Sequence, residues 1–343
     1  MLVVADHCRV PGFGAGFFGV DLFFVLSGYL ITRLLTDEQH ARGEIDLPRF
    51  YLRRILRLTP PLLLLLAVYV ALASTLWPDY SLLSHLGDAA LSGFYLSDYA
   101  QAFWQQPTYL LHTWSLSVEE HFYLLWPFAV LLLARVQLRW RLALLFGLYL
   151  LATAWRITEL DRLGWGVAYY SFDTRLSGLI FGALLAMGLP RLGRIPEGIA
   201  NAAGLFACIT LVSCLKMSTW EAPWALQWSM TLVELAAAAI LIAASVPTSW
   251  MSVVLSAPPL VGVGVISYGV YLWQYPVAHF LRDQLPWYQT WPLVLAVALT
   301  AATVSYLLVE RPLQRYRRSL GRQRTRGAGR TTVPAAAVTT SSC

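Results

Sequence analysis

One stretch of the chain decides the class of fold: Gly16-Phe17-Phe18-Gly19-Val20-Asp21-Leu22-Phe23-Phe24-Val25-Leu26-Ser27-Gly28-Tyr29-Leu30-Ile31-Thr32. It is apolar enough to enter a bilayer, yet it carries the carboxylate of Asp21 near its start. An ionisable group in a membrane helix is costly to bury, so it marks a functional site by default. His7 lies shortly before this stretch and is also titratable. We therefore expect the chemistry of this protein at a polar site close to a membrane boundary.

The composition of the whole chain also indicates a membrane protein. Of its 343 residues, 57% are hydrophobic and 13% are charged, whereas soluble domains carry about 25% charged residues. The mean hydropathy is +0.57, and the 14 Trp and 17 Tyr residues suit the aromatic belts at membrane surfaces. The four cysteines have no metal-type spacing, which predicts free thiols and no metal site.

Nine segments are apolar and long enough to cross the roughly 30 Å of hydrocarbon in a bilayer. They are residues 17–35, 58–77, 113–134, 142–157, 174–189, 199–216, 227–246, 259–281 and 291–309. The apolar run 1–5 is too short to span, and we expect it to be the last turns of a further helix with a truncated start. The sequence thus predicts an all-α, polytopic transmembrane helix bundle, with ten helices in the intact fold.

Basic residues in the loops predict the orientation of the bundle. The arginines of residues 42–57 place that segment in the cytoplasm, while the loop 78–112 has no Lys or Arg and should face outward. His7 then falls on the outer side. Most of the net charge of +6 lies in the arginine-rich end of the chain, which we interpret as a cytoplasmic lipid anchor and not as a nucleic-acid site. We expect a transmembrane domain over 1–312 and a basic, disordered tail over 313–343.

Two further motifs carry charge at the ends of predicted spans. Arg54 and Arg57 share a helix face at i, i+3 spacing, and two guanidinium groups so placed suit phosphate oxygens. Spacing alone equally allows a cytoplasmic anchor, the role expected for Arg53. Glu119 and Glu120 lie at the outer mouth of a span, where such a pair is suited either to balance a histidine base or to begin a hydrated helix.

Taken together, these motifs resemble the membrane-bound acyltransferase 3 family, whose members acylate sugars, cell-envelope glycans and some macrolides. The matching blocks follow the family order over nearly the whole length: residues 19–32, 54–60, 114–127, 172–179, 264–273 and 309–312. The resemblance implies an integral membrane O-acyltransferase of the bacterial inner membrane. It implies acyl-CoA, by family frequency acetyl-CoA, as donor substrate, and no bound cofactor.

The same resemblance implies roles for individual residues. His7 matches the essential histidine of the family, Arg54 and Arg57 match its two-arginine motif, and Glu119 matches the acid of its Trp-Ser-Leu block, with Glu120 beside it. We expect His7 to act as general base, because an imidazole titrates close to working pH. Asp21 or Glu119 is the expected carboxylate that orients it, since the adjacent Asp6 cannot face it on a helix.

The acceptor is expected to meet residues of the later blocks. Asp173, with Asp21, is expected to line an internal cavity, Arg175 belongs to the same block, and Tyr268 and Tyr271 lie at i, i+3 spacing. For the two tyrosines, packing or an aromatic belt is the alternative. Ser177 stands where the family often has an acid, and Gln274 where it often has a histidine.

Two other classes of function stay open at this stage. A transporter or flippase of lipid-linked sugars would explain the spans and the buried acids, but it has no need of an Arg-x-x-Arg block beside a titratable histidine. A catalytically inactive sensor is the second alternative. A serine hydrolase is disfavoured because Gly-x-Ser-x-Gly is absent.

Overall fold

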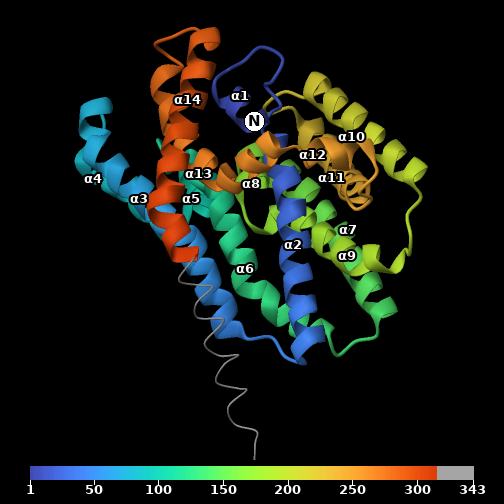
Figure 1. The fold of residues 1–343 in the computed structure, drawn as a ribbon. Helices are drawn as coiled ribbons and strands as arrows, with labels where there is room; N and C mark the ends of the chain where they lie inside the picture. Colours follow the sequence, from blue (N-terminus) through green and yellow to red (C-terminus); the bar gives the residue numbers. More distant parts are fainter. Residues whose placement is uncertain (315–343) are drawn as a thin grey trace, which may run out of the picture.

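The computed structural model describes residues 1–314, and within this range the regular secondary structure is helical, without a β-strand (Figure 1). The longer helices are α2 (Phe18–Arg42), α3 (Leu47–Leu76), α6 (Trp114–Leu133), α7 (Leu138–Leu163), α9 (Leu176–Gly188), α10 (Glu197–Met217), α11 (Met230–Ala244), α13 (Pro258–Leu281) and α14 (Trp287–Ser305). The shorter ones are α1 (Leu2–His7), α4 (Leu82–Gly93), α5 (Ser97–Trp104), α8 (Trp165–Tyr170), α12 (Trp250–Leu255) and the turns η1 (Leu111–Thr113), η2 (Asp173–Arg175), η3 (Leu189–Arg191), η4 (Ala225–Ser229) and η5 (Tyr306–Glu310).

Seven of the helices in residues 1–314 are long and apolar enough to cross a membrane. They correspond to the predicted spans except 174–189 and 259–281, so the expected count of nine or ten is not confirmed. In the first of these exceptions, α9 has 13 residues and rises about 20 Å, which is short of a bilayer. The all-α, multi-pass architecture is confirmed. The predicted tail lies outside the described residues from 315 onward.

Glycines let α2 and α9 approach each other closely. A Cβ atom at Gly28 would stand 2.0 Å from the Leu179 carbonyl oxygen, and one at Gly182 would stand 2.0 Å from the Val25 carbonyl oxygen. Neither position has room for any side chain, so the two backbones must be in direct contact. Small residues allow membrane helices to approach closely, and this contact joins the Asp21 segment firmly to α9.

The segment 78–112, expected as an outward loop, contains helices that pack back onto the bundle. His85 of α4 bonds the Tyr69 hydroxyl of α3 at 2.8 Å, and the Ser97 amide donates to the Ser117 hydroxyl of α6 at 3.1 Å. Asp88 accepts the amides of Thr108 and Tyr109 at 3.0 and 3.2 Å, although burial raises the pKa of this carboxyl. Hydrogen bonds to buried polar partners therefore hold this segment against the bundle. Its composition alone does not indicate them.

The first helix lies at one end of the bundle, beside the start of α14 and the end of α13 (Figure 1). Val4 and Cys8 pack there against Ala278 of α13 and Val294 of α14. Because α1 ends at His7, this apolar contact fixes the height and direction of the imidazole.

Candidate active site

The side chain of His7 is held by α13. Its Nδ1 atom lies 2.9 Å from the amide oxygen of Gln274, and its ring meets the Tyr275 ring edge-on at 4.8 Å. His112 stacks on Tyr275 at 5.1 Å between ring centroids. Gln274 and His112 are fully buried, whereas His7 is partly exposed. The site therefore contains two imidazoles around one tyrosine.

A line of polar side chains runs along one face of α13 away from His7. The Tyr271 hydroxyl donates to the His112 carbonyl oxygen at 2.7 Å, and the Tyr268 hydroxyl donates to the Leu58 carbonyl oxygen at 2.8 Å. Tyr268, Tyr271 and Gln274 follow one another at i, i+3 spacing, so this polar face of α13 rises about 9 Å from Tyr268 to Gln274. It links His7 with the part of α3 that follows Arg57.

Arg54 and Glu119 meet at the other end of this polar face. The Arg54 guanidinium lies 4.0 Å above the Tyr123 ring, and the Tyr123 hydroxyl donates to the Glu119 carboxylate at 2.8 Å. Ser27 of α2 bonds the same hydroxyl. The charges of Arg54 and Arg57 both act on Glu119, and Arg57 is exposed.

This arrangement corrects the expected depth of Glu119 and of the two arginines. The arginines were expected at the cytoplasmic surface and Glu119 at the outer mouth of a span. Instead, α3 begins at Leu47 and α6 begins at Trp114, so Arg54 and Glu119 each lie inside a helix, roughly 10 Å and roughly 8 Å from its start. Arg54 therefore approaches Glu119 through Tyr123 inside the bundle, whereas Arg57 is exposed.

Asp21 does not contact His7 but pairs with Arg175. The Arg175 Nη2 atom donates to the Asp21 Oδ1 atom at 2.6 Å, and its guanidinium is surrounded by the rings of Phe24, Trp114 and Tyr169 at 4.8 to 5.4 Å. Both side chains are buried, and the Asp21 Oδ2 and Arg175 Nε atoms have no protein partner among the described residues. This pair joins α2 to η2 through a desolvated contact.

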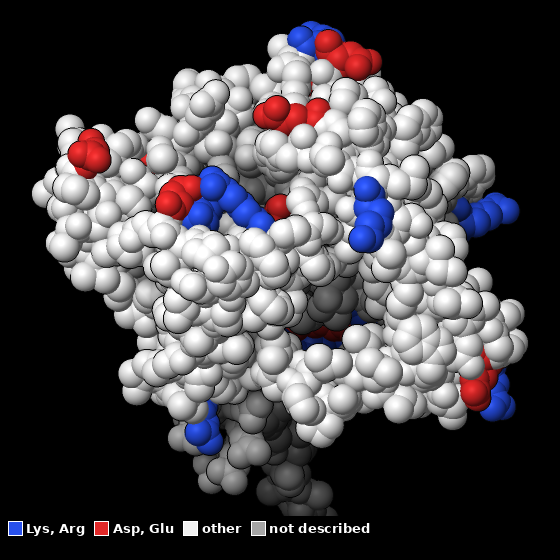
Figure 2. All heavy atoms as spheres, turned by 90° about the horizontal axis from the view of Figure 1, so that it is seen from above, with Lys and Arg blue, Asp and Glu red and all other residues white. Residues whose placement is uncertain are grey.

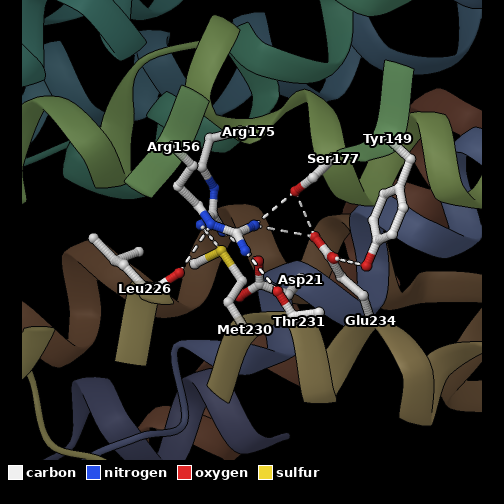
Figure 3. A network of polar contacts seen from close by, with 9 residues as sticks. All are labelled: Asp21, Tyr149, Arg156, Arg175, Ser177, Leu226, Met230, Thr231 and Glu234. Atoms are coloured by element: carbon white, nitrogen blue, oxygen red, sulfur yellow. Dashed lines mark hydrogen bonds and ion pairs between the residues drawn. The ribbon is translucent and has the colours of Figure 1, made fainter. Parts of the chain in front are cut away.

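A second buried charge network, missed by the sequence analysis, lies beside this pair (Figure 3). Arg156 of α7 bonds Ser177 of α9 at 2.7 Å and Glu234 of α11 at 3.3 Å, and Ser177 donates to Glu234 at 2.6 Å. Arg156 is 0% exposed and lies within α7, which continues to Leu163. The Glu234 carboxylate of α11 thus lies directly beside Ser177. The sequence does carry a signal for this network, because Arg156 and Glu234 are ionisable residues within apolar segments.

The other predicted acceptor residues are already engaged. Asp173 accepts the Tyr99 hydroxyl at 3.0 Å and the Trp155 indole at 2.6 Å, and Tyr268 and Tyr271 donate to backbone carbonyls. Glu120 is partly buried, and one of its oxygens has no partner. Figure 2 shows that the face seen from above is hollowed, with acidic and basic side chains visible inside. No group of three potential metal ligands occurs in residues 1–314.

A family model described as an acyltransferase domain matches residues 1–310 of this chain. The chain therefore belongs to this acyltransferase family, the one its motifs resemble, and the expected class of enzyme is confirmed.

Curated relatives carry more specific names. The chain is 32% identical to the peptidoglycan O-acetyltransferase OatA of Listeria monocytogenes, over 91% of this chain and 54% of the relative. It is 33% identical to the putative peptidoglycan O-acetyltransferase YrhL of Bacillus subtilis, over 91% and 52%, and 31% identical to the O-acetyltransferase OatA of Staphylococcus aureus, over 91% and 55%. The chain thus spans about half the length of these relatives. No solved structure matches it significantly.

Proposed function

We propose that this protein is an integral membrane O-acetyltransferase that moves an acetyl group from acetyl-CoA to a hydroxyl of a cell-envelope glycan. The observation that carries the proposal is the polar face of α13, which leads to His7 from the cluster of Arg54, Tyr123 and Glu119. Family membership supports the reaction class, and the names of the relatives favour a glycan such as peptidoglycan as acceptor.

Each end of this path has a defined part in the reaction. Arg54 and Arg57 hold the phosphates of the donor, since guanidinium groups bind phosphate oxygens through paired hydrogen bonds. His7 accepts the proton of the acceptor hydroxyl as its oxygen bonds to the acetyl carbon. The carbon–sulfur bond then breaks, and the CoA thiolate leaves and takes up that proton. Glu119 and Glu120 set the charge near the arginines, and Asp21 and Arg175 shape the interior between α2 and η2.

The orientation of the bundle follows from the positions of the basic segments. We place Arg54, Arg57 and the tail 313–343 on the cytoplasmic side of the bacterial inner membrane, where acetyl-CoA is available, and His7 toward the outer side. The transmembrane domain 1–312 then carries the whole path. A transporter of lipid-linked sugars is not favoured, because it requires neither the arginine pair nor a histidine at the end of the polar face.

The proposal is tested with purified protein in lipid nanodiscs, radiolabelled acetyl-CoA and peptidoglycan fragments. We expect label in the glycan with the native protein and a loss of roughly 100-fold or more with His7→Gln, because a positioned base contributes about 10²–10⁴-fold. Arg54→Ala should raise the KM for acetyl-CoA.

Two surface variants are the matched controls. His40 is an exposed histidine at the end of α2, and Arg53 neighbours Arg54 without any predicted role at the site. His40→Gln and Arg53→Ala should keep native rates and KM. A His7→Gln protein that is monodisperse and fully active would refute the proposal.

A further inference from the structure

The contact between His7 and Gln274 determines which ring nitrogen is free to act. The Nδ1 atom of His7 lies 2.9 Å from the Gln274 Oε1 atom, and an amide oxygen can only accept a hydrogen bond. Nδ1 must therefore carry the proton of the neutral imidazole, which leaves the lone pair on Nε2. A general base accepts a proton with that lone pair, so the Gln274 amide determines which ring nitrogen can act as the base.

The surroundings of His7 disfavour a second proton on the ring. Burial is the largest cause that lowers the pKa of His7, and the charges of Arg282 and His279 at the end of α13 lower it further. His112 from η1 is a second imidazole close by. Asp6, on the same helix, points to another side of it, and no carboxylate forms an ion pair with His7 among residues 1–314. The orienting carboxylate expected from the sequence is replaced by an uncharged amide.

The geometry points to Gln274 as the positioning residue that fixes His7 in the Nδ1–H tautomer and presents Nε2 to the acceptor hydroxyl. Gln274 is suited to this because it is completely buried and because Tyr275 restrains the imidazole edge-on. An amide orients the ring without adding a negative charge that would favour the imidazolium form. This inference rests on the proposed function for its kinetic meaning, but the tautomer itself is independent of activity.

The tautomer is read directly by nitrogen NMR of protein labelled with ¹⁵N-histidine in nanodiscs. The chain has six histidines, and the His7 signals are those lost in His7→Gln. We expect a protonated Nδ1 and an unprotonated Nε2 in the native protein, and loss of that preference in Gln274→Leu. A native ring protonated on Nε2, or an unchanged tautomer in Gln274→Leu, would overturn the inference even if His7 proved essential.

Kinetics supply the second readout. Gln274→Leu should lower kcat by roughly 10- to 100-fold, part of the contribution of a well-placed base, with little change in the KM for acetyl-CoA. Gln274→Glu keeps the acceptor but adds a carboxylate, which raises the pKa of the imidazole. The neutral base then forms only at higher pH, so the acid limb of the kcat/KM profile should move to higher pH.

The control is Gln289→Glu, which adds the same charge at an exposed residue of α14 and should leave the profile in place. A merely structural role of Gln274 would reduce activity in both variants without moving the acid limb, and that result contradicts the inference. Loss of activity in His7→Gln with retained tautomer control by Gln274 supports both proposals. Full activity of His7→Gln contradicts the proposed function. The NMR result alone then decides whether Gln274 sets the tautomer.

Discussion

Arg175 and Asp21 form a short ion pair whose side chains are 0% and 3% exposed. Arg9 and Asp283 form a pair of almost the same length, 2.7 Å, whose side chains are 61% and 59% exposed. Because the two distances are nearly equal, the two ion pairs differ mainly in how far their side chains are buried. Solvent screens the outer pair, whereas removing one partner of the inner pair leaves an uncompensated charge inside the protein.

Stability should therefore respond differently at the two pairs. We expect Asp21→Asn to lower the free energy of unfolding by about 3–5 kcal/mol, and Arg9→Met by less than about 1 kcal/mol. Thermal unfolding of the purified variants, followed by retention of the monodisperse peak, measures both. The double variant Asp21→Asn with Arg175→Met should recover part of the loss, since no lone charge remains. Equal losses of unfolding free energy at the two pairs would show that burial does not determine how much each ion pair contributes to stability.

Single residues were predictable from the sequence mainly where a charge interrupts an apolar run. Asp21 stood out in this way, but its partner Arg175 is 154 positions away, and no local pattern encodes such a pairing. Gln274 was noted only as a departure from the family pattern. Its contact with His7 arises because α1 packs onto α13, which is a long-range event.

At the scale of elements, the contact between α2 and α9 depends on glycine. Inserting a methyl group where a carbonyl oxygen lies 2.0 Å away must push the helices apart. We expect Gly182→Ala to lower the free energy of unfolding by about 1–3 kcal/mol, the usual effect of overpacking, and to lower acetyl transfer by displacing η2.

Gly147 is the matched control for this prediction. It lies within α7 with no atom within 4 Å of a Cβ atom, so Gly147→Ala should be neutral or slightly stabilising through helix propensity. Thermal unfolding in the same detergent compares the two. A destabilisation of similar size at both glycines would argue that helix contact is not its cause.

The helices themselves were largely predictable because apolar length is a local property. Seven predicted spans match helices of sufficient length and hydropathy. The span 174–189 is not confirmed because η2 and η3 bracket a short α9. The helices within 78–112 were not predicted because they depend on buried partners of polar side chains. The number of apolar residues in a segment predicts that a helix forms there. It does not show where that helix begins, ends or folds back.

At the scale of the whole molecule, the proposed mechanism places the donor site and the base near the two ends of the polar face of α13. Arg54 lies near one end of this polar face and His7 at the other, and the face between Tyr268 and Gln274 rises only about 9 Å. A thioester held by its phosphates therefore needs to reach through part of the bundle, and not across a complete bilayer. In the proposed orientation, donor and acceptor approach from opposite sides of the membrane.

The most direct test of this account separates the two substrates by the membrane. Sealed vesicles of known protein orientation receive radiolabelled acetyl-CoA on the cytoplasmic side only and glycan fragments on the outer side only. The account predicts acetylated glycan on the outer side, lost in His7→Gln and preserved in His40→Gln. Product that forms only when both substrates share one side of the vesicle, with none formed across the sealed membrane, would contradict it.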